Sequence, residues 1–502
     1  MPSVRAERWL RVLVLAPALR WLMLLVLALF TVIYFVVALP RVAYPFDIDF
    51  LEDDVLIEAW RFAQGLPVFA PPNADFVPHV YTPLYMLLAA PMLKLGGLSF
   101  LSMRLLSLAA TIATGLLLFS AGYQISQQHA NALIGPGLFF AGYALTGAQY
   151  ELARVDSLHL TLAVAGTLIG ITRAESRRAV CLAALLLALA CFAKQSGIVF
   201  ALGMAAYLFA VQRQRAVEFS VVCAMATVAP LSVMDRLTNG WSSFYLLQVP
   251  GSDPPLASRI ISYLQHDLLQ ALAPLCLLAL AAIVLHLRAR PLSSASGWLW
   301  FILLAIADSG WMRARLGGNI NTLMPAYTFL CLAPAIVLSK LGTSSHINKT
   351  TRAVMQSLVY LLVIAQCVLC RYNPLTRIPD VAMQQSGQRL IERIRQMPGP
   401  VLVLEHPYYA LLAHKSPGVS LTALWHARER GALPLPTDLA QRITQQYYAG
   451  IIADEGTYSE VEAELDALIG ASYTLGVELS AQDAPPTLSG LVVRPAHLFV
   501  PR

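Results

Sequence analysis

Long runs of apolar residues dominate this chain and restrict the folds that are open to it. The runs are roughly 15 to 22 residues long, close to the length at which a helix crosses a bilayer. Of the 502 residues, 57% are hydrophobic and 13% are charged, which would leave a water-soluble protein with large exposed apolar patches. Because lipid cannot satisfy backbone polar groups, the crossing segments must be helices. The sequence therefore predicts a mainly α-helical, polytopic membrane protein.

The spacing of these runs predicts about 11 transmembrane helices. The first run is a retained helix and not a cleaved signal peptide, because no small-x-small cleavage site follows it. Segment 82–97 is also apolar, but its two prolines, its lysine and its glycine pair favour a helix at the outer surface. A crossing there, with 179–211 merged into one bent span, is the alternative. The expected helices are 21–39, 101–122, 132–149, 156–172, 179–193, 196–211, 217–235, 266–286, 297–310, 322–339 and 354–371.

Basic residues gather before the first apolar run and in alternate loops, and the positive-inside rule places these segments in the cytoplasm. They are Arg5, Arg8, Arg11, Arg20, Arg173, Arg177, Arg178, Arg213, Arg215, Arg288, Arg290, Lys340, Lys349 and Arg352. The outward-facing segments are then 40–100, with juxtamembrane helices, 150–156, 236–265, 311–321 and the tail from about residue 372 onwards.

The tail alternates helix-like and strand-like stretches, which favours a small α/β domain. We expect a transmembrane domain over 1–371 and an extracytoplasmic domain over 372–502. The helix-like stretches are 381–397, 438–448 and 459–471, and the strand-like ones are 401–404, 450–453 and 491–494.

Several function classes are disfavoured by the composition. The net charge of +6 is spread among loops without a basic stripe, which argues against a nucleic-acid partner. All seven cysteines lie in apolar runs, so no disulfide framework is implied, and the Cys367–Cys370 pair is more typical of small packing residues than of a redox centre. No internal repeat is apparent, which weakens a secondary-transporter interpretation.

Six carboxylates follow the first apolar run within residues 47–58. Asp49, Glu52 and Asp53 are spaced so that at least two share one face of a helical turn. Such a pair could act as a general base or hold a divalent metal, although a solvated acidic loop is the simpler alternative. The complete set is Asp47, Asp49, Glu52, Asp53, Asp54 and Glu58.

A second charged group lies at the outer turn 150–156, where Arg154 and Asp156 follow Glu151. Charges this close to the hydrocarbon are costly and are commonly functional, although Arg154 and Asp156 could simply pair with each other. Five cations occupy outer turns against the positive-inside trend, which favours a bound anion such as phosphate over headgroup snorkelling. They are Arg104, Arg154, Lys194, Arg313 and Arg315.

Polar and aromatic residues at two further turns could contact a sugar. Asn319 and Asn321 follow a glycine pair and could hydrogen-bond hydroxyl groups, although a plain turn at the start of a helix is equally compatible. Tyr81 and Tyr85 suit stacking on a sugar ring or packing on a lipid tail, and they also fit ordinary interfacial aromatics. His79, beside them, is more typical of a bystander than of an acid or base.

In their order along residues 20–340, these segments resemble the GT-C membrane glycosyltransferases, in the family-39-like group and the arabinose- or mannose-transferring enzymes. The matching segments are DIDFLEDD, AWRFAQGLPVF, YTPLYMLLAAP, SMRLLS, Arg154-Val-Asp156, FAKQSG and GGNINTLMP. The resemblance implies a GT-C type helix bundle and a polyprenyl-phosphate-linked sugar donor. It implies that Asp49 or Glu52 is the general base, that Asp156 is the second-loop acid, and that Arg154, Lys194 and Arg313 or Arg315 receive the lipid phosphate.

We therefore expect a hexosyl- or pentosyltransferase that acts at the outer face of the cytoplasmic membrane on a glycan, lipid or protein acceptor. A divalent metal is possible, because some relatives use one. The alternatives are a transporter or flippase of lipid-linked saccharides, a polysaccharide polymerase or ligase, and a scaffold whose tail binds a partner. A transporter would carry charged residues deep in its helices, and Asp235 and Asp308 are the few candidates.

Overall fold

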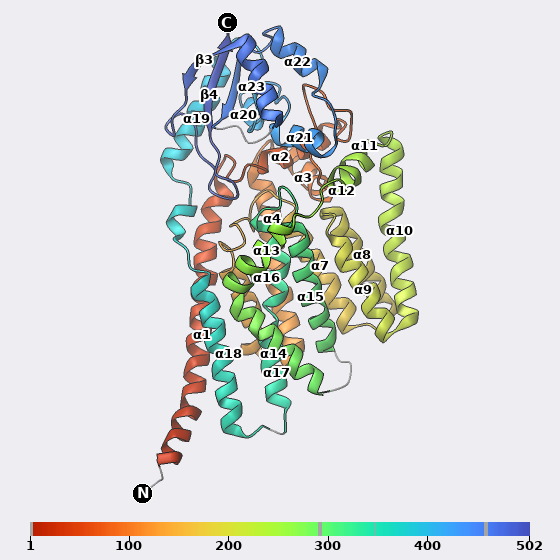
Figure 1. Ribbon diagram of the computed structural model, residues 1–502, viewed down its shortest axis with the longest axis vertical. Coiled ribbons are helices and arrows are strands. Elements are labelled where there is room, and N and C mark those ends of the chain that lie inside the picture. Colours follow the sequence, from red (N-terminus) through yellow and green to blue (C-terminus); the bar gives the residue numbers. More distant parts are fainter. Residues whose placement is uncertain (1–3, 290–293, 346, 456–459) are drawn as a thin grey trace.

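The computed structural model describes residues 4–289, 294–345, 347–455 and 460–502. Helix α1 (Val4–Ala43) runs from the N-terminal end of the molecule towards the opposite end, where the C-terminal sheet lies (Figure 1). Between these ends the chain forms a bundle of helices. The predicted basic position Arg290 and the predicted helix start at residue 459 lie outside the described residues.

The bundle is built from apolar helices whose ends follow ordinary capping chemistry. Ser99, Ser176 and Asn348 each accept a backbone N–H with the side chain at the start of a bundle helix. Helices α1 and α18 lie side by side along the molecule (Figure 1). The bundle helices after α1 are α4 (Phe100–Ser126), α5 (His129–Ala132), α6 (Ile134–Ala141), α7 (Asp156–Thr172), α8 (Arg177–Ala193), α9 (Gly197–Val211), α10 (Arg213–Leu237), α14 (Ala273–Ala289), α15 (Ser294–Arg313), α16 (Met324–Leu330), α17 (Ala333–Thr343) and α18 (Lys349–Leu369).

In the described part of the chain, five helices are long and apolar enough to cross a membrane. A sixth span results if Ala257–Ala271 and Ala273–Leu287, which meet at an 89° bend, are counted as one. Three further apolar helices are shorter: Leu84–Gly96, Asp156–Thr172 and Gly197–Val211. The protein is thus a mainly helical, multi-pass membrane protein, while the count of about 11 spans stays a prediction.

The predicted helix over 132–149 is wrong in its second half, because α6 ends at Ala141. Gly147 and Ala148 adopt positive φ values of 100° and 54°, which a right-handed helix cannot contain. The carbonyl of Ala148 instead accepts hydrogen bonds from Arg41 Nη2 at 2.8 Å and from Ser489 Oγ at 2.8 Å. Residues 142–155 therefore form an irregular, largely buried turn that brings Gln149, Glu151 and Arg154 to the end of α1 and the loop that follows it.

Two short helices follow α1 and cover the end of the bundle that lies towards the C-terminal sheet (Figure 1). They are α2 (Glu52–Gln64) and α3 (Leu84–Gly96), and they pack on each other. Short elements connect the longer helices: α11 (Trp241–Ser243), η1 (Phe244–Gln248), α12 (Val249–Gly251), α13 (Ala257–Ser262) and η2 (Tyr263–Ala271) lie between α10 and α14, and η3 (Ile320–Leu323) lies between α15 and α16.

The C-terminal region contains a four-stranded sheet of order β1-β2-β4-β3. β1 (Val401–Val403) pairs in parallel with β2 (Gly450–Asp454), and β4 (Pro495–Pro501) pairs antiparallel with β2 and with β3 (Tyr473–Glu478). The predicted strand 491–494 is wrong, because the fourth strand begins at Pro495, and β3 was not predicted. The helices of this region are η4 (Pro374–Arg377), α19 (Val381–Gln396), α20 (Tyr408–Leu412), α21 (Leu421–Trp425), η5 (His426–Arg430), α22 (Thr437–Thr444) and α23 (Glu460–Ser472).

Among the described residues, the buried apolar side chains form two clusters, and the second joins the loop after α1 to the C-terminal region. It contains Phe46 and Val55 from the loop and α2 together with Leu390 and Leu402 from α19 and β1. The ring of Phe46 stacks on that of Tyr409 with centroids 5.7 Å apart. This shared core fixes the C-terminal region against the first outer loop.

Candidate functional site

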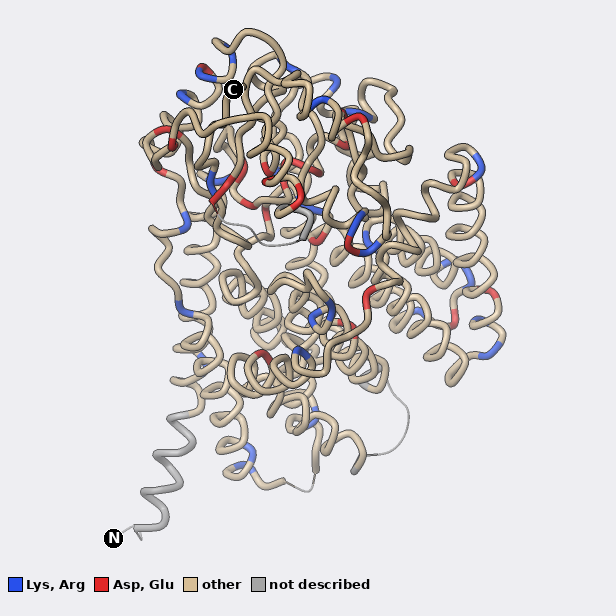
Figure 2. The backbone as a smooth tube through the Cα atoms, turned by 45° about the horizontal axis from the view of Figure 1, so that its top comes forward, with Lys and Arg blue, Asp and Glu red and all other residues tan. Residues whose placement is uncertain are grey.

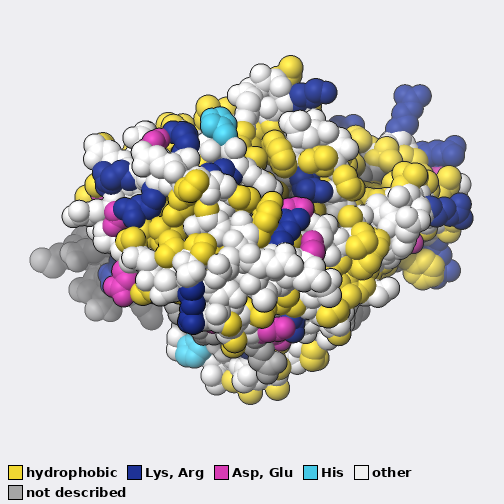
Figure 3. Space-filling view, turned by 90° about the horizontal axis from the view of Figure 1, so that it is seen from above, with side chains coloured by type: hydrophobic (Ala, Val, Ile, Leu, Met, Phe, Trp, Pro, Cys, Tyr) yellow, Lys and Arg dark blue, Asp and Glu magenta, His cyan; other side chains and the backbone are white. Residues whose placement is uncertain are grey.

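Charged segments are concentrated at the end of the molecule that carries the first outer loop and the C-terminal sheet (Figure 2). Seen from above, acidic and basic side chains at this end are interspersed with hydrophobic ones (Figure 3). Beneath this mixed surface lie buried ion pairs that connect the first loop, the 150–156 turn and the C-terminus of α8. Buried charges of this kind persist only where each has partners.

Asp49 lies in the short segment between α1 and α2 and is fully buried. Its Oδ1 forms an ion pair with Arg154 and accepts the backbone N–H of Leu51 at 3.2 Å, while Oδ2 accepts Gln149 Nε2 at 2.5 Å. Burial raises the pKa of Asp49, and the Arg154 guanidinium opposes that rise. Because a carboxylate accepts about four hydrogen bonds, Oδ2 retains room for one further donor.

Gly490, in the loop before β4, closes over this carboxylate. It has a φ of 65°, and a Cβ at this position would clash with Asp49 Oδ2. The backbone N–H groups of Leu488 and Ser489 both reach the carbonyl of Ile48 at 2.9 Å, which holds the loop in place. The C-terminal region therefore forms one wall around Asp49.

Asp156, at the start of α7, is the centre of a second set of contacts. Its Oδ1 accepts hydrogen bonds from Lys194 Nζ at 2.6 Å and from Asn321 Nδ2 at 3.1 Å. Its Oδ2 lies 3.3 Å from Arg154 Nε. Arg154 thus bridges Asp156 and Asp49, and four segments that are distant in sequence meet in one network.

Tyr81 and His79 extend this network along the first loop. The hydroxyl of Tyr81 accepts Arg154 Nη2 at 3.2 Å, and the Tyr81 ring lies 4.4 Å from the His79 ring. Neither ring nitrogen of His79 has a hydrogen-bond partner in the described part of the chain. Burial lowers the pKa of His79 to about 3, helped by Arg154 and Arg430, so the imidazole is neutral at pH 7.

Glu52, the other predicted base, is fully occupied by structural contacts. Oε1 accepts Arg104 Nε at 2.8 Å and the Ala153 N–H at 2.7 Å, and Oε2 accepts Arg104 Nη2 at 2.7 Å and the Ile48 N–H at 2.8 Å. The side chains of Glu52 and Arg104 are both fully buried. Four hydrogen bonds leave no acceptor position for a substrate hydroxyl, so the geometry favours Asp49 over Glu52 as the base.

Arg104 fits a structural role better than the predicted phosphate site. Its remaining N–H groups bind the carbonyls of Arg41, Tyr44 and Phe46 at 2.6–2.9 Å. Together with the two bonds to Glu52, these contacts use all five of its donors.

The other predicted site residues lie at the edge of the network or outside it. The Arg313 side chain pairs with Asp267 at 3.0 Å and donates to the Gly318 carbonyl at 2.7 Å. The Asn319 side chain caps η3 through the Ile320 N–H at 2.7 Å. The Tyr85 hydroxyl is buried against Met103 and Ser107 in the α3–α4 contact. Their predicted substrate roles stay predictions.

No three His, Cys, Asp or Glu side chains among the described residues are arranged to hold a metal ion. Asp49 and Asp156 are each committed to cationic partners, and Glu52 is saturated. These contacts leave the Asp49 network without a free set of ligands for a divalent metal, and metal dependence stays a prediction.

A crystal structure of ArnT from Cupriavidus metallidurans bound to undecaprenyl phosphate aligns at a TM-score of 0.60 and 12% identity, over 94% of this chain and 97% of ArnT. The apo state of the same protein aligns at 0.58 and 14% identity, with the same coverage. The chain has the GT-C fold. No family model and no curated protein sequence matches the chain.

Within this GT-C fold, His406 is a buried residue that the sequence pattern did not single out. Its Nδ1 lies 2.7 Å from Asp47 and its Nε2 lies 3.1 Å from Asp454, so it joins the first loop to β2. Burial opposes the charged form, but Asp454 and Asp47 raise the pKa of His406 well above its usual value. The signal in the sequence was the tail segment Glu405-His406-Pro407-Tyr408-Tyr409, whose Tyr408 hydroxyl also binds Asp47 at 3.0 Å.

Asp53 and Asp54, in the first turn of α2, are buried. Burial raises the pKa of Asp54 to about 7, although a hydrogen bond with Ser420 and the charge of His406 oppose the rise. Neither oxygen of Asp53 has a hydrogen-bond partner among the described residues. These acids face the C-terminal region and not the Asp49 network.

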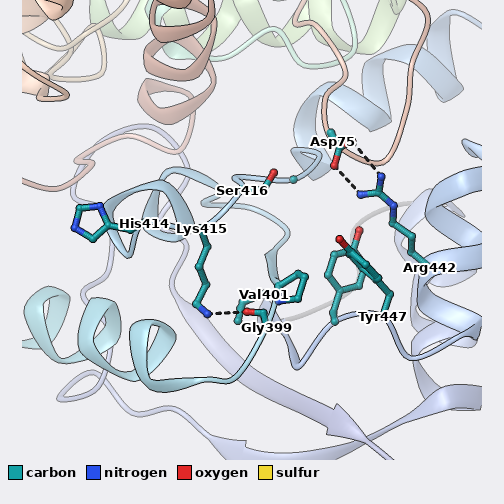
Figure 4. A pocket seen from close by; sticks show the side chains of 11 residues that line it. Asp75, Gly399, Val401, His414, Lys415, Ser416, Arg442 and Tyr447 are labelled. Carbon is teal, nitrogen blue, oxygen red and sulfur yellow. Dashed lines mark hydrogen bonds and ion pairs between the residues drawn. The ribbon is translucent and has the colours of Figure 1, made fainter.

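A cavity of about 410 Å³ lies at a second contact between the first loop and the C-terminal region (Figure 4). Arg442 of α22 binds Asp75 of the loop at 2.6 and 3.1 Å, with Tyr447 beside it, and Lys415 Nζ binds the Gly399 carbonyl at 2.6 Å. None of the predicted site residues lines this cavity. Its ion pair is exposed, so it contributes little to the stability of the contact.

Proposed function

We propose that this chain transfers a sugar from a polyprenyl-phosphate-linked donor to an acceptor hydroxyl, with Asp49 as the general base. The observation that carries the proposal is the buried network in which Asp49, Arg154, Asp156 and Lys194 meet at one end of a membrane bundle. The GT-C fold is shared with ArnT, which was crystallised with undecaprenyl phosphate. The outer end of the bundle would face the outside of the cytoplasmic membrane, as the basic loops at the other end favour.

The chemistry that we assign to these residues is a single displacement. The acceptor oxygen attacks the anomeric carbon while its proton passes to Asp49 Oδ2, and the bond from the anomeric carbon to the phosphate oxygen breaks. The lipid phosphate leaves as an anion, which needs cationic stabilisation and no proton. Burial favours proton transfer to Asp49, because it raises the pKa of Asp49 and so makes its carboxylate a stronger base.

The other members of the network would keep the base in place. Arg154 binds both Asp49 and Asp156, and Lys194 and Asn321 hold Asp156, so the Asp49 carboxylate cannot rotate freely. The aromatic ring of Tyr81, held by Arg154, would line the path of the donor sugar.

The test is sugar transfer by the purified protein in lipid, supplied with a panel of radiolabelled polyprenyl-phosphate sugars and with candidate lipid, glycan and protein acceptors. Asp49→Asn should lower the rate by about 10²- to 10⁴-fold, the usual contribution of a positioned base. Asp75→Asn, in the same loop but exposed and paired with Arg442, is the matched control and should retain the wild-type rate.

Full transfer by Asp49→Asn would refute the assignment of the base. Failure of the wild-type protein to transfer label from any donor, combined with protein-dependent movement of lipid-linked sugar across vesicles, would favour the flippase alternative. Folding of each variant is checked by its thermal unfolding temperature.

A further inference from the structure

A strained turn lies beside the carboxylate to which we assign the role of base. Gly147 and Ala148 have φ values of 100° and 54°, and the second is unfavourable for a residue that carries a Cβ. Ala148 is also fully buried, and strain of this kind persists only where the surrounding structure compensates for it. Strained backbone is concentrated at functional sites, and the residue that this turn positions is Gln149.

Contacts from two distant segments hold the turn in this conformation. The carbonyl of Ala148 accepts hydrogen bonds from Arg41 Nη2, at the end of α1, and from Ser489 Oγ, in the loop before β4, both at 2.8 Å. Arg41 Nη2 also donates to Ser489 Oγ at 2.7 Å, so the three groups form a closed set. The backbone conformation of Ala148 is therefore fixed by tertiary contacts and not by local sequence preference.

The side-chain amide of Gln149 is satisfied at one end only. Nε2 donates to Asp49 Oδ2 at 2.5 Å, whereas Oε1 is buried without a hydrogen-bond partner in the described part of the chain. Leaving a buried amide oxygen without a partner is costly. A side chain that served only the stability of the fold would be expected to satisfy both ends of its amide. The contact with Asp49 is thus the feature that this arrangement preserves, as expected at a functional site.

Gln149 binds the oxygen to which we assign proton transfer. Arg154 and the Leu51 N–H both meet Oδ1 of Asp49, whereas Gln149 is the one described residue that donates to Oδ2. Burial raises the pKa of Asp49, Arg154 and the Leu51 N–H oppose that rise, and the charge of Glu52 adds to it. A hydrogen bond to the ionised form of a carboxylate favours that form. The Gln149 amide therefore fixes the direction of Oδ2 and favours its ionised state.

Gly490 covers the same hydrogen bond from the C-terminal region. A Cβ at this position would clash with Asp49 Oδ2 and would lie 3.1 Å from Gln149 Nε2. The loop before β4 thus packs directly on the donor and the acceptor, which limits the movement of both.

We propose that Gln149 is a positioning residue for the general base, and that the strained turn before it, held by Arg41 and Ser489, sets its place. Gln149 acts through Asp49, whose Oδ2 it directs towards the acceptor hydroxyl. The inference rests on the proposed function, since it concerns how Asp49 is prepared for that reaction. It also gives the loop before β4 a part in catalysis, because Ser489 holds the turn and Gly490 covers the hydrogen bond.

The experiment measures kcat and KM across a range of pH for the full-length protein in lipid, with the polyprenyl-phosphate sugar that the donor panel identifies. Gln149→Met keeps a side chain of similar length but removes the N–H donor. The value of kcat should fall by about tenfold or more, because a base displaced by about 1 Å can lose about 10²-fold in rate. KM for the donor should stay within about twofold, since the lost contact serves the chemical step.

The pH profile separates positioning of the base from a general loss of structure. Without the Gln149 donor the ionised form of Asp49 is less favoured, so its pKa rises and the base becomes protonated at a higher pH. The acid limb of the kcat profile, where activity is lost as the base takes up a proton, should move upward by about one pH unit, the effect of losing one hydrogen bond to a charged group.

Gln366→Met is the matched control. Gln366, in α18, is also fully buried: its Nε2 donates to the Ala271 carbonyl at 3.0 Å, and its Oε1 has no partner among the described residues. Neither of its hydrogen bonds reaches the Asp49 network. Its replacement should lower the unfolding temperature to a degree similar to that of Gln149→Met, and it should leave the acid limb where it lies in the wild type.

Ser489→Ala provides a second perturbation if Gln149→Met fails to fold. It removes the hydroxyl that holds the Ala148 carbonyl and keeps both Gln149 and Asp49. The value of kcat should fall and the acid limb should move in the same direction by a smaller amount. A folded Ser489→Ala protein with the wild-type profile would overturn the role that we give to the turn.

The outcomes also distinguish this inference from the proposed function. If the wild-type protein transfers sugar and Asp49→Asn does not, but Gln149→Met keeps the wild-type kcat and acid limb, the inference is overturned and the proposed function stands. A fall in kcat with an unmoved acid limb, as large as that in Gln366→Met, would make Gln149 a structural residue and would also overturn the inference. If the wild-type protein transfers no sugar from any donor, both are overturned.

Discussion

Replacing Glu52 by Gln distinguishes the structural acid of the first loop from the catalytic one. In the protein, Glu52 neutralises the fully buried Arg104 through two hydrogen bonds and accepts two backbone N–H groups from Ile48 and Ala153. An amide offers one acceptor oxygen in place of two and turns its NH₂ towards N–H donors. The variant would therefore lose about half of these bonds and leave the charge of Arg104 without a counter-ion.

The magnitude follows from the burial of both partners. Removing one member of a buried ion pair costs about 3–5 kcal/mol, because the remaining charge has no compensation. That is a large fraction of the stability of a folded domain, which is roughly 5–15 kcal/mol. We therefore expect Glu52→Gln to lower the thermal unfolding temperature of the detergent-solubilised protein by at least several degrees and to reduce its yield. Asp49→Asn should lower it less, because Arg154 keeps Asp156 as a counter-ion.

The assay pairs thermal unfolding, followed by size-exclusion fluorescence, with sugar transfer at a temperature where both variants remain folded. If Glu52 is structural and Asp49 is the base, folded Glu52→Gln keeps more transfer activity than Asp49→Asn. A Glu52→Gln protein that unfolds at the wild-type temperature but transfers no sugar would refute this assignment and would make Glu52 the base. Arg104→Gln serves as a second perturbation of the same pair and should destabilise the protein to a similar degree.

Two further predictions concern the contacts of the C-terminal region. Gly490→Ala should lower transfer at least tenfold, because its Cβ would displace the Asp49 carboxylate, and normal kinetics in this variant would count against the enclosed position of Asp49. His406→Gln should destabilise the protein, because the pKa of His406 is raised by Asp454 and Asp47. A raised pKa gives stability that is fully present below about pH 6.5 and declines as the pH rises through the folded-state value, so the difference in unfolding temperature between wild type and variant should shrink at alkaline pH. A constant difference across that range would contradict a charged His406.

The sequence singled out most of the residues of the network, because charge near an apolar run is rare and therefore informative. Arg154, Asp156 and Lys194 were expected at outer turns, and the structure brings them together with Asp49. Their individual roles stay predictions. The expected helix over 132–149 failed at Gly147 and Ala148, because the tertiary contact of Arg41 with the Ala148 carbonyl stabilises a turn that hydropathy alone does not indicate.

The choice between the two first-loop acids required the structure. In the sequence, Asp49 and Glu52 are two acids of the same loop with nothing to rank them. The packing shows that Arg104 and backbone donors fill every acceptor position of Glu52, whereas Oδ2 of Asp49 retains one acceptor position. The arginines that pair with the two acids are distant in sequence: Arg104 is 52 residues from Glu52, and Arg154 is 105 residues from Asp49.

The sequence by itself determined that the chain is a helical membrane protein, because apolar runs of helix-spanning length have no other stable arrangement in lipid. It also determined which turns carry charge. Only the tertiary structure decided that the C-terminal region reaches the first outer loop, since His406 meets Asp47 across 359 residues and Arg430 meets Leu316 across 114. Contacts at such separations follow from packing and not from local pattern, and for that reason the tail, which looked least informative in the sequence, forms one wall of the candidate site.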